Sequence, residues 1–164
     1  MLQIIHSMRE LDFPALMEIY IEGNLENAAA YGSGGLLRAE EAFRDYLRES
    51  FFPVKGAFCA IWEENGKSVS ALRMEPYQDG WLLEALETAP EYRERGYAKS
   101  LVRAVQAYMA ERSMAPVYSH VSKGNKASLQ THFACGFDEY LDHAVYIDGT
   151  VTRRAYTLRY SPAI

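Results

Sequence analysis

The first twenty residues space their apolar side chains in a way that favours a short strand followed by a helix. A strand is predicted over residues 2–6, and Asp12 followed by Pro14 is typical of a helix N-cap and first turn. The predicted buried stripe of this helix consists of Leu16, Ile19 and Tyr20.

The next thirty residues change from an aperiodic stretch to a second helical pattern. Residues 22–37 have no clear period and end in Gly32-Ser33-Gly34-Gly35, which predicts a mobile loop. A helix is expected over residues 38–49, with an inward face made of Phe43, Tyr46 and Leu47.

The middle of the chain alternates strand and helix patterns. Residues 57–64 and 68–77 flank Asn65-Gly66, a dipeptide that strongly favours a tight turn between antiparallel strands. Residues 81–88 are almost continuously apolar, as expected of a central strand covered on both faces. A strong amphipathic helix is predicted over residues 97–112. Its repeating apolar positions are Ala98, Leu101, Val102, Val105, Tyr108 and Met109.

The last third completes a mixed sheet. Residues 116–121 predict a strand that runs parallel to 81–88 through a right-handed crossover. Asn125 is expected to cap a short helix with Leu129 and Phe133 inward and a left-handed Gly136 at its end. Two strands flank Asp148-Gly149. We expect a single α/β domain over residues 1–164: a mixed, mostly antiparallel sheet of six or seven strands, with a parallel central pair and helices on both faces.

Composition narrows the class of protein. The chain is 49% hydrophobic, which is enough for an ordinary core, and 17 basic against 22 acidic residues argue against a nucleic-acid binder. This balance favours a small cationic partner only slightly. Cys59 and Cys135 stand alone, so neither a metal site nor a disulfide framework is indicated. Without a signal-peptide pattern or a membrane-spanning run, a cytoplasmic location away from membranes is expected.

The stretch YRERGYAKS, residues 92–100, lies where the predicted strand 81–88 leads into a helix. The first amides of a helix lack internal partners and carry a partial positive charge, which suits an anion. Gly96 and Ala98 remove side-chain bulk there, and Arg93 and Arg95 can add charge-assisted bonds. The alternative is a tight turn with solvated arginines. Neither the GxGxxG nor the P-loop pattern is present.

In the context of this element order, RERGYA (residues 93–98) resembles the Q/R-x-x-G-x-G/A motif of the GNAT superfamily of acyl-CoA-dependent N-acyltransferases. NKASLQTHFACGF (residues 125–137) is similar to the second cofactor-contacting helix of that family. The resemblance implies a sheet splayed between its central strands and acetyl-CoA as co-substrate. The implied cofactor contacts are Leu86, Glu87 and Thr88 at the pantetheine arm, Arg93, Glu94, Arg95, Gly96, Tyr97, Ala98 and Lys99 at the pyrophosphate, and Asn125 and Ser128 opposite.

Amide formation from a thioester requires a base for the charged amine and a polarised carbonyl, which a backbone amide near residues 86–88 can supply. Glu84 interrupts the apolar strand, and desolvation would raise the pKa of its carboxyl. Strand alternation places Glu84, Leu86 and Thr88 on one face. The alternative is a solvated, edge-facing Glu84. His120 is the second candidate base, and its alternative is an ordinary hydrogen-bonded histidine.

His132 occupies the place where the family often carries a tyrosine acid, seven residues after the asparagine. It shares a helix face with Ser128, which predicts that it faces the cofactor sulfur as a proton donor. The alternatives are a surface histidine, a thiolate that leaves unassisted, or help from Tyr140 or Tyr146. Cys135 is interpreted as a packing residue rather than a nucleophile.

These features together predict a cytoplasmic N-acetyltransferase that moves an acetyl group from acetyl-CoA directly to a primary amine of a small molecule or peptide. The alternatives are a non-catalytic acyl-CoA-binding or regulatory module and a longer acyl donor such as succinyl-CoA. A homodimer through an exposed edge of the last strands is open, because Tyr146, Tyr156 and Tyr160 could pair with a second subunit or pack within the chain.

Overall fold

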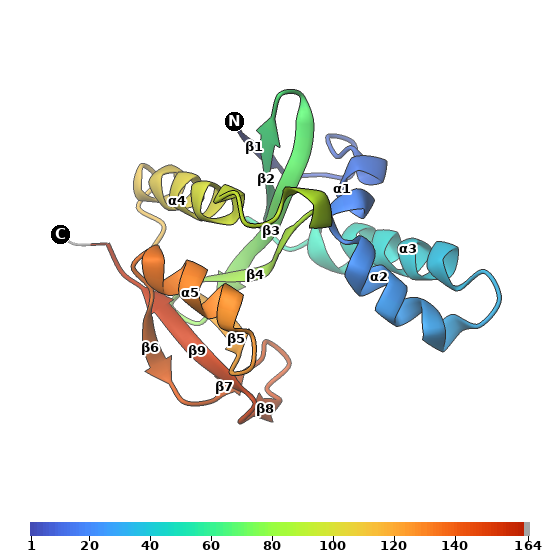
Figure 1. Ribbon diagram of the computed structural model, residues 1–164. Helices are drawn as coiled ribbons and strands as arrows, with labels where there is room; N and C mark the ends of the chain where they lie inside the picture. Colours follow the sequence, from blue (N-terminus) through green and yellow to red (C-terminus); the bar gives the residue numbers. More distant parts are fainter. Residues whose placement is uncertain (163–164) are drawn as a thin grey trace.

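A seven-stranded mixed sheet forms the centre of the computed structural model, which describes residues 1–162 (Figure 1). The strand order is β1-β2-β3-β4-β5-β9-β6, and every neighbouring pair is antiparallel except β4 and β5. The predicted fold class is confirmed. The strands are β1 (Leu2–Ile5), β2 (Phe58–Glu64), β3 (Lys67–Tyr77), β4 (Gly80–Thr88), β5 (Val117–Ser122), β6 (Asp138–Leu141) and β9 (Ala155–Tyr160). A separate pair, β7 (Ala144–Val145) and β8 (Val151–Thr152), flanks Asp148-Gly149 as expected.

Helices cover both faces of this sheet. They are α1 (Phe13–Ile19), α2 (Ile21–Ala28), α3 (Gly35–Tyr46), α4 (Tyr97–Ala110) and α5 (Lys126–Ala134), with short turns at η1 (Ala29–Tyr31), η2 (Leu47–Phe51) and η3 (Pro90–Tyr92). In residues 1–162 no helix is both long and apolar enough to cross a bilayer.

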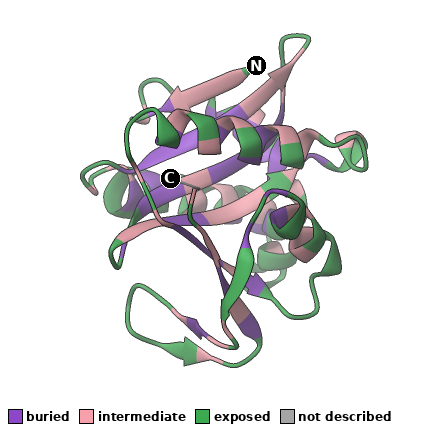
Figure 2. Cartoon of the chain, turned by 90° about the vertical axis from the view of Figure 1, so that its left-hand side faces the viewer, coloured by how far each residue is buried: buried purple, intermediate pink, exposed green. Residues whose placement is uncertain are grey.

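The amphipathic patterns account for the two cores. Leu101, Val102 and Val105 of α4 are buried against one face of the sheet, while the outer side of α4 is exposed (Figure 2). Leu16 and Ile19 of α1 lie buried in a second core on the opposite face. Burial of each such side chain stabilises the folded state by about 1.5–3 kcal/mol relative to its exposure to water. Residues at helical spacing were therefore sufficient to identify α1 and α4, one helix on each face of the sheet.

Two helix starts follow the predicted capping chemistry. The Asp12 carboxylate accepts a hydrogen bond from the Ala15 amide at 3.1 Å, and the Asn125 side-chain oxygen accepts one from the Ser128 amide at 3.1 Å. Gly136 follows α5 with φ of +86°, the left-handed conformation that glycine adopts without a side-chain clash.

The predicted loop over residues 22–37 is wrong, because α2 and η1 occupy most of it. In α2 only Asn24 is buried, so the segment shows no apolar stripe even though Leu, Glu and Ala favour a helix. The helix instead packs beside α3 (Figure 1). Tyr46 is also exposed on α3, at 38%, although the pattern predicted it to be buried.

The last strands pack within the chain. β9 lies between β5 and β6, so Tyr156 and Tyr160 stand on an internal strand and pack partly against the core under α4. Tyr146 remains 40% exposed. The edge of this end of the sheet is therefore β6, not β9.

Candidate functional site

A β-bulge interrupts β4 in the middle of the predicted site. Glu84 pairs with Arg73 and Glu87 pairs with Ala71, so Ala85 and Leu86 together oppose Leu72. Ala85 has φ of +56°, which is unusual for a residue with a side chain. Its carbonyl accepts a 2.6 Å hydrogen bond from the hydroxyl of Tyr20, a buried residue at the end of α1. Tyr20 thus holds the bulge in place.

The bulge changes which side chains share a face. Because Arg73 and Ala71 are two residues apart, their partners Glu84 and Glu87 lie on the same face. Leu86 packs instead against the core under α4. The prediction that Glu84, Leu86 and Thr88 share one face is therefore wrong, since strict alternation does not survive an extra residue in the strand.

The parallel pair β4–β5 is short. Its register runs from Trp81 opposite Val117 to Leu83 opposite Ser119. Beyond this point β4 continues to pair with β3, and β5 with β9. The two central strands therefore diverge past Leu83, as the expected splay requires, and the backbone of residues 86–88 borders the opening.

Glu84 and His120 are the first residues beyond the last paired position. Leu82 and Tyr118 are register partners that pack together with Tyr77. Glu84 and His120 each follow by two residues and thus lie on the same face as that cluster. The two predicted bases therefore lie on the same face of the sheet, one on each of the strands that diverge here.

Two charged side chains, Arg73 and Glu75, lie near Glu84. Its carboxylate lies 3.8 Å from Arg73 Nε, and the side chain keeps 23% exposure. Burial and the neighbouring Glu75 carboxyl raise the pKa of Glu84 to about 8, whereas the Arg73 charge lowers it. Desolvation prevails because an ionised carboxylate loses more from burial than this offset pair returns.

Arg73 is held by aromatic rings. Its guanidinium lies 5.2 Å from the ring centre of Tyr46 and 5.6 Å from those of Phe43 and Phe51. Such contacts favour a partly desolvated cation. Phe43, which the pattern assigned to the core, therefore also forms one wall of the site, together with Phe51.

His120 lies between two tyrosine rings. The imidazole meets Tyr77 at 5.3 Å and Tyr146 at 5.2 Å, both edge to face. Its buried Nε2 has no protein partner within residues 1–162, and burial lowers the pKa of the ring. The lowered pKa favours the neutral imidazole, and the free Nε2 differs from the hydrogen-bonded alternative.

The predicted phosphate segment forms a tight loop before α4. Glu94 and Gly96 have positive φ, +62° and +82°, a conformation that can turn backbone amides toward one point. The Ser100 amide donates to the Gly96 carbonyl, so the amides of Tyr97, Ala98 and Lys99 precede the first intrahelical bond. A Cβ on Gly96 would meet nothing within 4 Å. Arg95 rests on the ring of Tyr92 at 5.5 Å.

His132 does not occupy the predicted position. It is only 1% exposed, its Nδ1 donates to the Ser128 carbonyl at 2.7 Å, and its Nε2 accepts from the Ser119 hydroxyl at 2.9 Å. Phe133, predicted to be inward, is 48% exposed. Ser119 and Ser128 satisfy both ring nitrogens, so this polar side chain can be buried on the inner face of α5. The surface-histidine alternative is wrong as well.

Three residues of the site were missed in the sequence: Tyr20, Arg73 and Glu75. Arg73 and Glu75 occupy alternating positions of a strand that is otherwise mostly apolar, the same signal that singled out Glu84. Tyr20 was assigned to the core because its spacing is that of a buried stripe, and nothing in the sequence indicates its bond to Ala85. In the described part of the chain no three His, Cys, Asp or Glu side chains are grouped to hold a metal ion.

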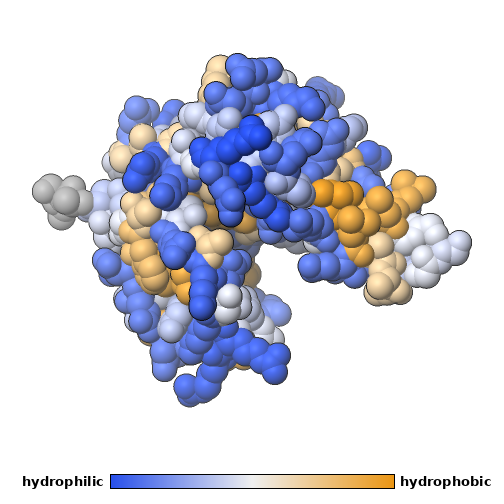
Figure 3. Space-filling model, viewed as in Figure 1, coloured by the Kyte–Doolittle hydropathy of each residue, from blue (hydrophilic) through white to orange (hydrophobic). Residues whose placement is uncertain are grey.

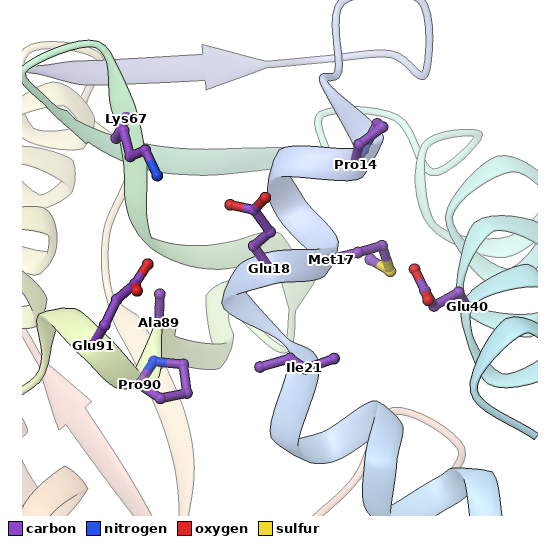
Figure 4. Close-up of a pocket in the computed structure, with 9 residues that line it drawn as sticks. All are labelled: Pro14, Met17, Glu18, Ile21, Glu40, Lys67, Ala89, Pro90 and Glu91. Carbon is purple, nitrogen blue, oxygen red and sulfur yellow. The ribbon is translucent and has the colours of Figure 1, made fainter.

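The surface is hollowed between α2–α3 and the lobe that carries β7 and β8 (Figure 3). A separate cavity of about 560 Å³ lies between α1 and η3 (Figure 4). Its lining includes Glu18, Ile21 and Glu91 but neither Glu84 nor His120. This cavity is therefore distinct from the part of the sheet that carries the two predicted bases.

Comparison with known proteins gives the family. The family described as "Acetyltransferase (GNAT) family" matches residues 12–137, whereas the search of curated proteins gives no match. PaiA N-acetyltransferase from Thermoplasma acidophilum in complex with coenzyme A is 13% identical with a TM-score of 0.65, covering 97% of this chain and 98% of that one. Ribosomal-protein-S18-alanine N-acetyltransferase from Escherichia coli is 20% identical, with a TM-score of 0.58 and coverages of 97% and 91%.

A third solved structure, aminoglycoside 6'-acetyltransferase type Ii, is 13% identical, with a TM-score of 0.66 and coverages of 98% and 96%. These likenesses show the fold. The family match spans more than half of the chain, and the chain therefore belongs to the acetyltransferase (GNAT) family.

Proposed function

We propose that this protein transfers an acetyl group from acetyl-CoA directly to a primary amine. The observation that carries the proposal is Glu84, a carboxyl whose pKa is raised to about 8 at the point where β4 and β5 diverge. A general base works best with a pKa near the working pH. Family membership supports acetyl-CoA as the acetyl donor, since the structure of PaiA N-acetyltransferase is a complex with coenzyme A.

The amides of Tyr97, Ala98 and Lys99, with the loop over residues 94–96, would hold the pyrophosphate. The backbone of residues 86–88 would pair with the pantetheine arm, and Asn125 and Ser128 would border it on the other side. An anion at the start of α4 gains from unpaired amides and from the helix dipole. Arg95 and Lys99 are exposed beside it and add positive charge.

Acetyl-CoA supplies a thioester whose carbonyl carbon an amine can attack, so that a C–N bond forms as the C–S bond breaks. Glu84 takes the proton of the ammonium, directly or through a water, and leaves the nitrogen lone pair free. A backbone amide in residues 86–88 polarises the carbonyl oxygen. His120, whose Nε2 has no protein partner and whose pKa is lowered by burial, would accept the second proton that the nitrogen loses.

Departure of the thiolate does not depend on His132, whose two nitrogens are already bonded within the protein. A thiol with an ordinary pKa of about 8.5 can leave as the anion. Tyr146, which packs on His120 and is 40% exposed, would donate a proton to the thiolate afterwards.

The acceptor is a small molecule or an exposed peptide amine. The experiment is to measure acetyl-CoA binding by calorimetry and then thiol release against polyamines, amino acids, aminoglycosides and peptides. We expect release with one class of amine, and slower release when succinyl-CoA replaces acetyl-CoA. Tight binding of acetyl-CoA with no release against any amine would support the non-catalytic acyl-CoA-binding module instead.

A further inference from the structure

Arg93 opens the RERGYA motif, yet its guanidinium is directed toward α2. Its Nη1 and Nη2 donate to the two carboxylate oxygens of Glu22 at 2.9 and 2.8 Å, and its Nε donates to the Thr88 carbonyl at 3.3 Å. Glu22 lies in the first turn of α2, 71 residues earlier in the chain. Two parallel bonds of this kind are the strongest arginine–carboxylate geometry.

The surroundings of Arg93 are acidic. The Glu87 carboxylate is 3.8 Å from Nη2, and the charges of Glu22 and Glu26 help burial to raise the pKa of Glu87. A phosphate drawn to Arg93 would therefore also approach at least two carboxylates, whose repulsion offsets the attraction. Arg93 is the cation that allows these acidic side chains to lie together.

The cavity in Figure 4 separates the two segments that this pair joins. Ile21 lies on one wall, and Pro90 and Glu91 lie on the other (Figure 4). Glu22 follows Ile21 directly, and Arg93 lies two residues after Glu91. Direct packing is interrupted at the cavity, so the Arg93–Glu22 pair ties α2 to the cofactor loop just beyond it.

We propose that Arg93 is a positioning residue for the acceptor, holding α2 against the cofactor loop, rather than a ligand of the pyrophosphate. This rests on the proposed function, because α2 begins directly after Tyr20, whose hydroxyl holds the Ala85 carbonyl beside Glu84. The first turn of α2 is thus fixed at two points, at Tyr20 and at Glu22. Loss of the Glu22 contact would let the first turn of α2, on the acceptor's side of the site, move. The amides at the start of α4 that would bind the phosphates would stay in place.

The test compares Arg93→Gln, Glu22→Gln and the double variant in the full-length protein. Each single change should raise the acceptor KM about fivefold and alter the acetyl-CoA Kd by less than about twofold, and the double variant should be no worse than the poorer single. Exchanging the charges, with Glu22→Arg and Arg93→Glu together, should restore part of the loss. Arg112→Gln, at an exposed Arg112–Glu111 pair beyond the end of α4, is the matched control.

The result that would overturn the proposal is a tenfold weaker acetyl-CoA Kd in Arg93→Gln with no change in Glu22→Gln, since that pattern assigns Arg93 to the phosphates. If no amine is acetylated by the wild type, the proposed function fails while the tie remains testable. Amide hydrogen exchange over residues 21–28 should then be faster in both single variants and unchanged in Arg112→Gln. Equal exchange in all proteins would rule the tie out.

Discussion

Two arginine–glutamate pairs lie in or beside the candidate site, and they differ in geometry and in exposure to water. Arg73 and Glu84 lie 3.8 Å apart on neighbouring strands, with side chains 14% and 23% exposed. Arg93 and Glu22 meet through two bonds of 2.8 and 2.9 Å, with side chains 39% and 53% exposed. The better geometry thus belongs to the pair that water reaches, which suits it to fixing positions.

The pKa directions express the same difference. Arg93 holds the pKa of Glu22 below its usual value, mainly through the side-chain hydrogen bond. The pKa of Glu84 is raised to about 8, mainly by burial, although Arg73 opposes this rise. A bidentate pair at Glu84 would have kept it ionised and unable to hold a proton. The offset geometry of the buried pair is therefore what keeps Glu84 useful as a base.

The largest expected effect comes from removing the carboxyl of the buried pair. Glu84→Gln keeps the side-chain volume but cannot accept a proton, so kcat should fall about 10²- to 10³-fold. In the wild type the rate should rise with pH through about 8, because Glu84 is protonated below that value and ionised above it. The measurement is thiol release between pH 6 and 9.

Glu139→Gln, an exposed position on β6, serves as its control and should keep the wild-type profile. If Glu84→Gln retained the full rate and the same rise with pH, the base would have to be another group. His120→Ala would then be the next variant to measure.

The second prediction concerns the two charged neighbours of Glu84. Their replacement should move the midpoint of the pH profile in opposite directions. Arg73→Met removes a charge that lowers the pKa of Glu84, so the midpoint of the pH profile should move upward. Glu75→Gln removes a carboxyl that raises it, so the midpoint should move downward. A shift of about one unit would change the rate at pH 7 up to about tenfold.

Circular dichroism should show folded protein for both variants before the profiles are compared. Midpoints that moved in the same direction would indicate that Glu84 does not set the profile. Arg93→Gln should leave the midpoint where it is, which separates the buried pair from the exposed one.

The third prediction concerns Tyr20, which stands between the two pairs. Tyr20→Phe leaves the partly buried Ala85 carbonyl without its donor, and this should lower the free energy of unfolding by about 1–3 kcal/mol. Urea denaturation measures the loss. Activity should fall less than in Arg73→Met, because no charge beside Glu84 changes. A variant as stable as the wild type would mean that the bulge does not need this bond.

The sequence was most informative where one local rule decides the structure. The helical spacing of Leu101, Val102 and Val105 predicted α4, and Asn65-Gly66 predicted the β2–β3 hairpin. α2 was missed because it buries only Asn24, and a helix with so little buried surface leaves no periodic trace.

The candidate site was predictable as a list of residues but not as a geometry. Glu84 and His120 were identified because polar groups in apolar strands are conspicuous, and the parallel register puts them on one face of the sheet. Their orientation relative to Leu86 depends on one extra residue, Ala85, which has no sequence signal. The partners of Arg93 and His132 come from elements far along the chain, and no local pattern specifies such contacts.

The smallest expected effect separates the two pairs by their exposure to salt. Raising the ionic strength from 0.1 to 1 M shortens the Debye length from about 10 to about 3 Å, which weakens exposed charge pairs far more than buried ones. Hydrogen exchange over residues 21–28 should therefore accelerate about twofold in the wild type but not in Arg93→Gln, which has already lost its tie. The midpoint of the pH profile should stay near 8, since the Arg73–Glu84 pair lies mostly out of reach of the ions. A midpoint as sensitive to salt as the exchange rate would show that water reaches both pairs alike, and the raised pKa of Glu84 would then need a cause other than burial.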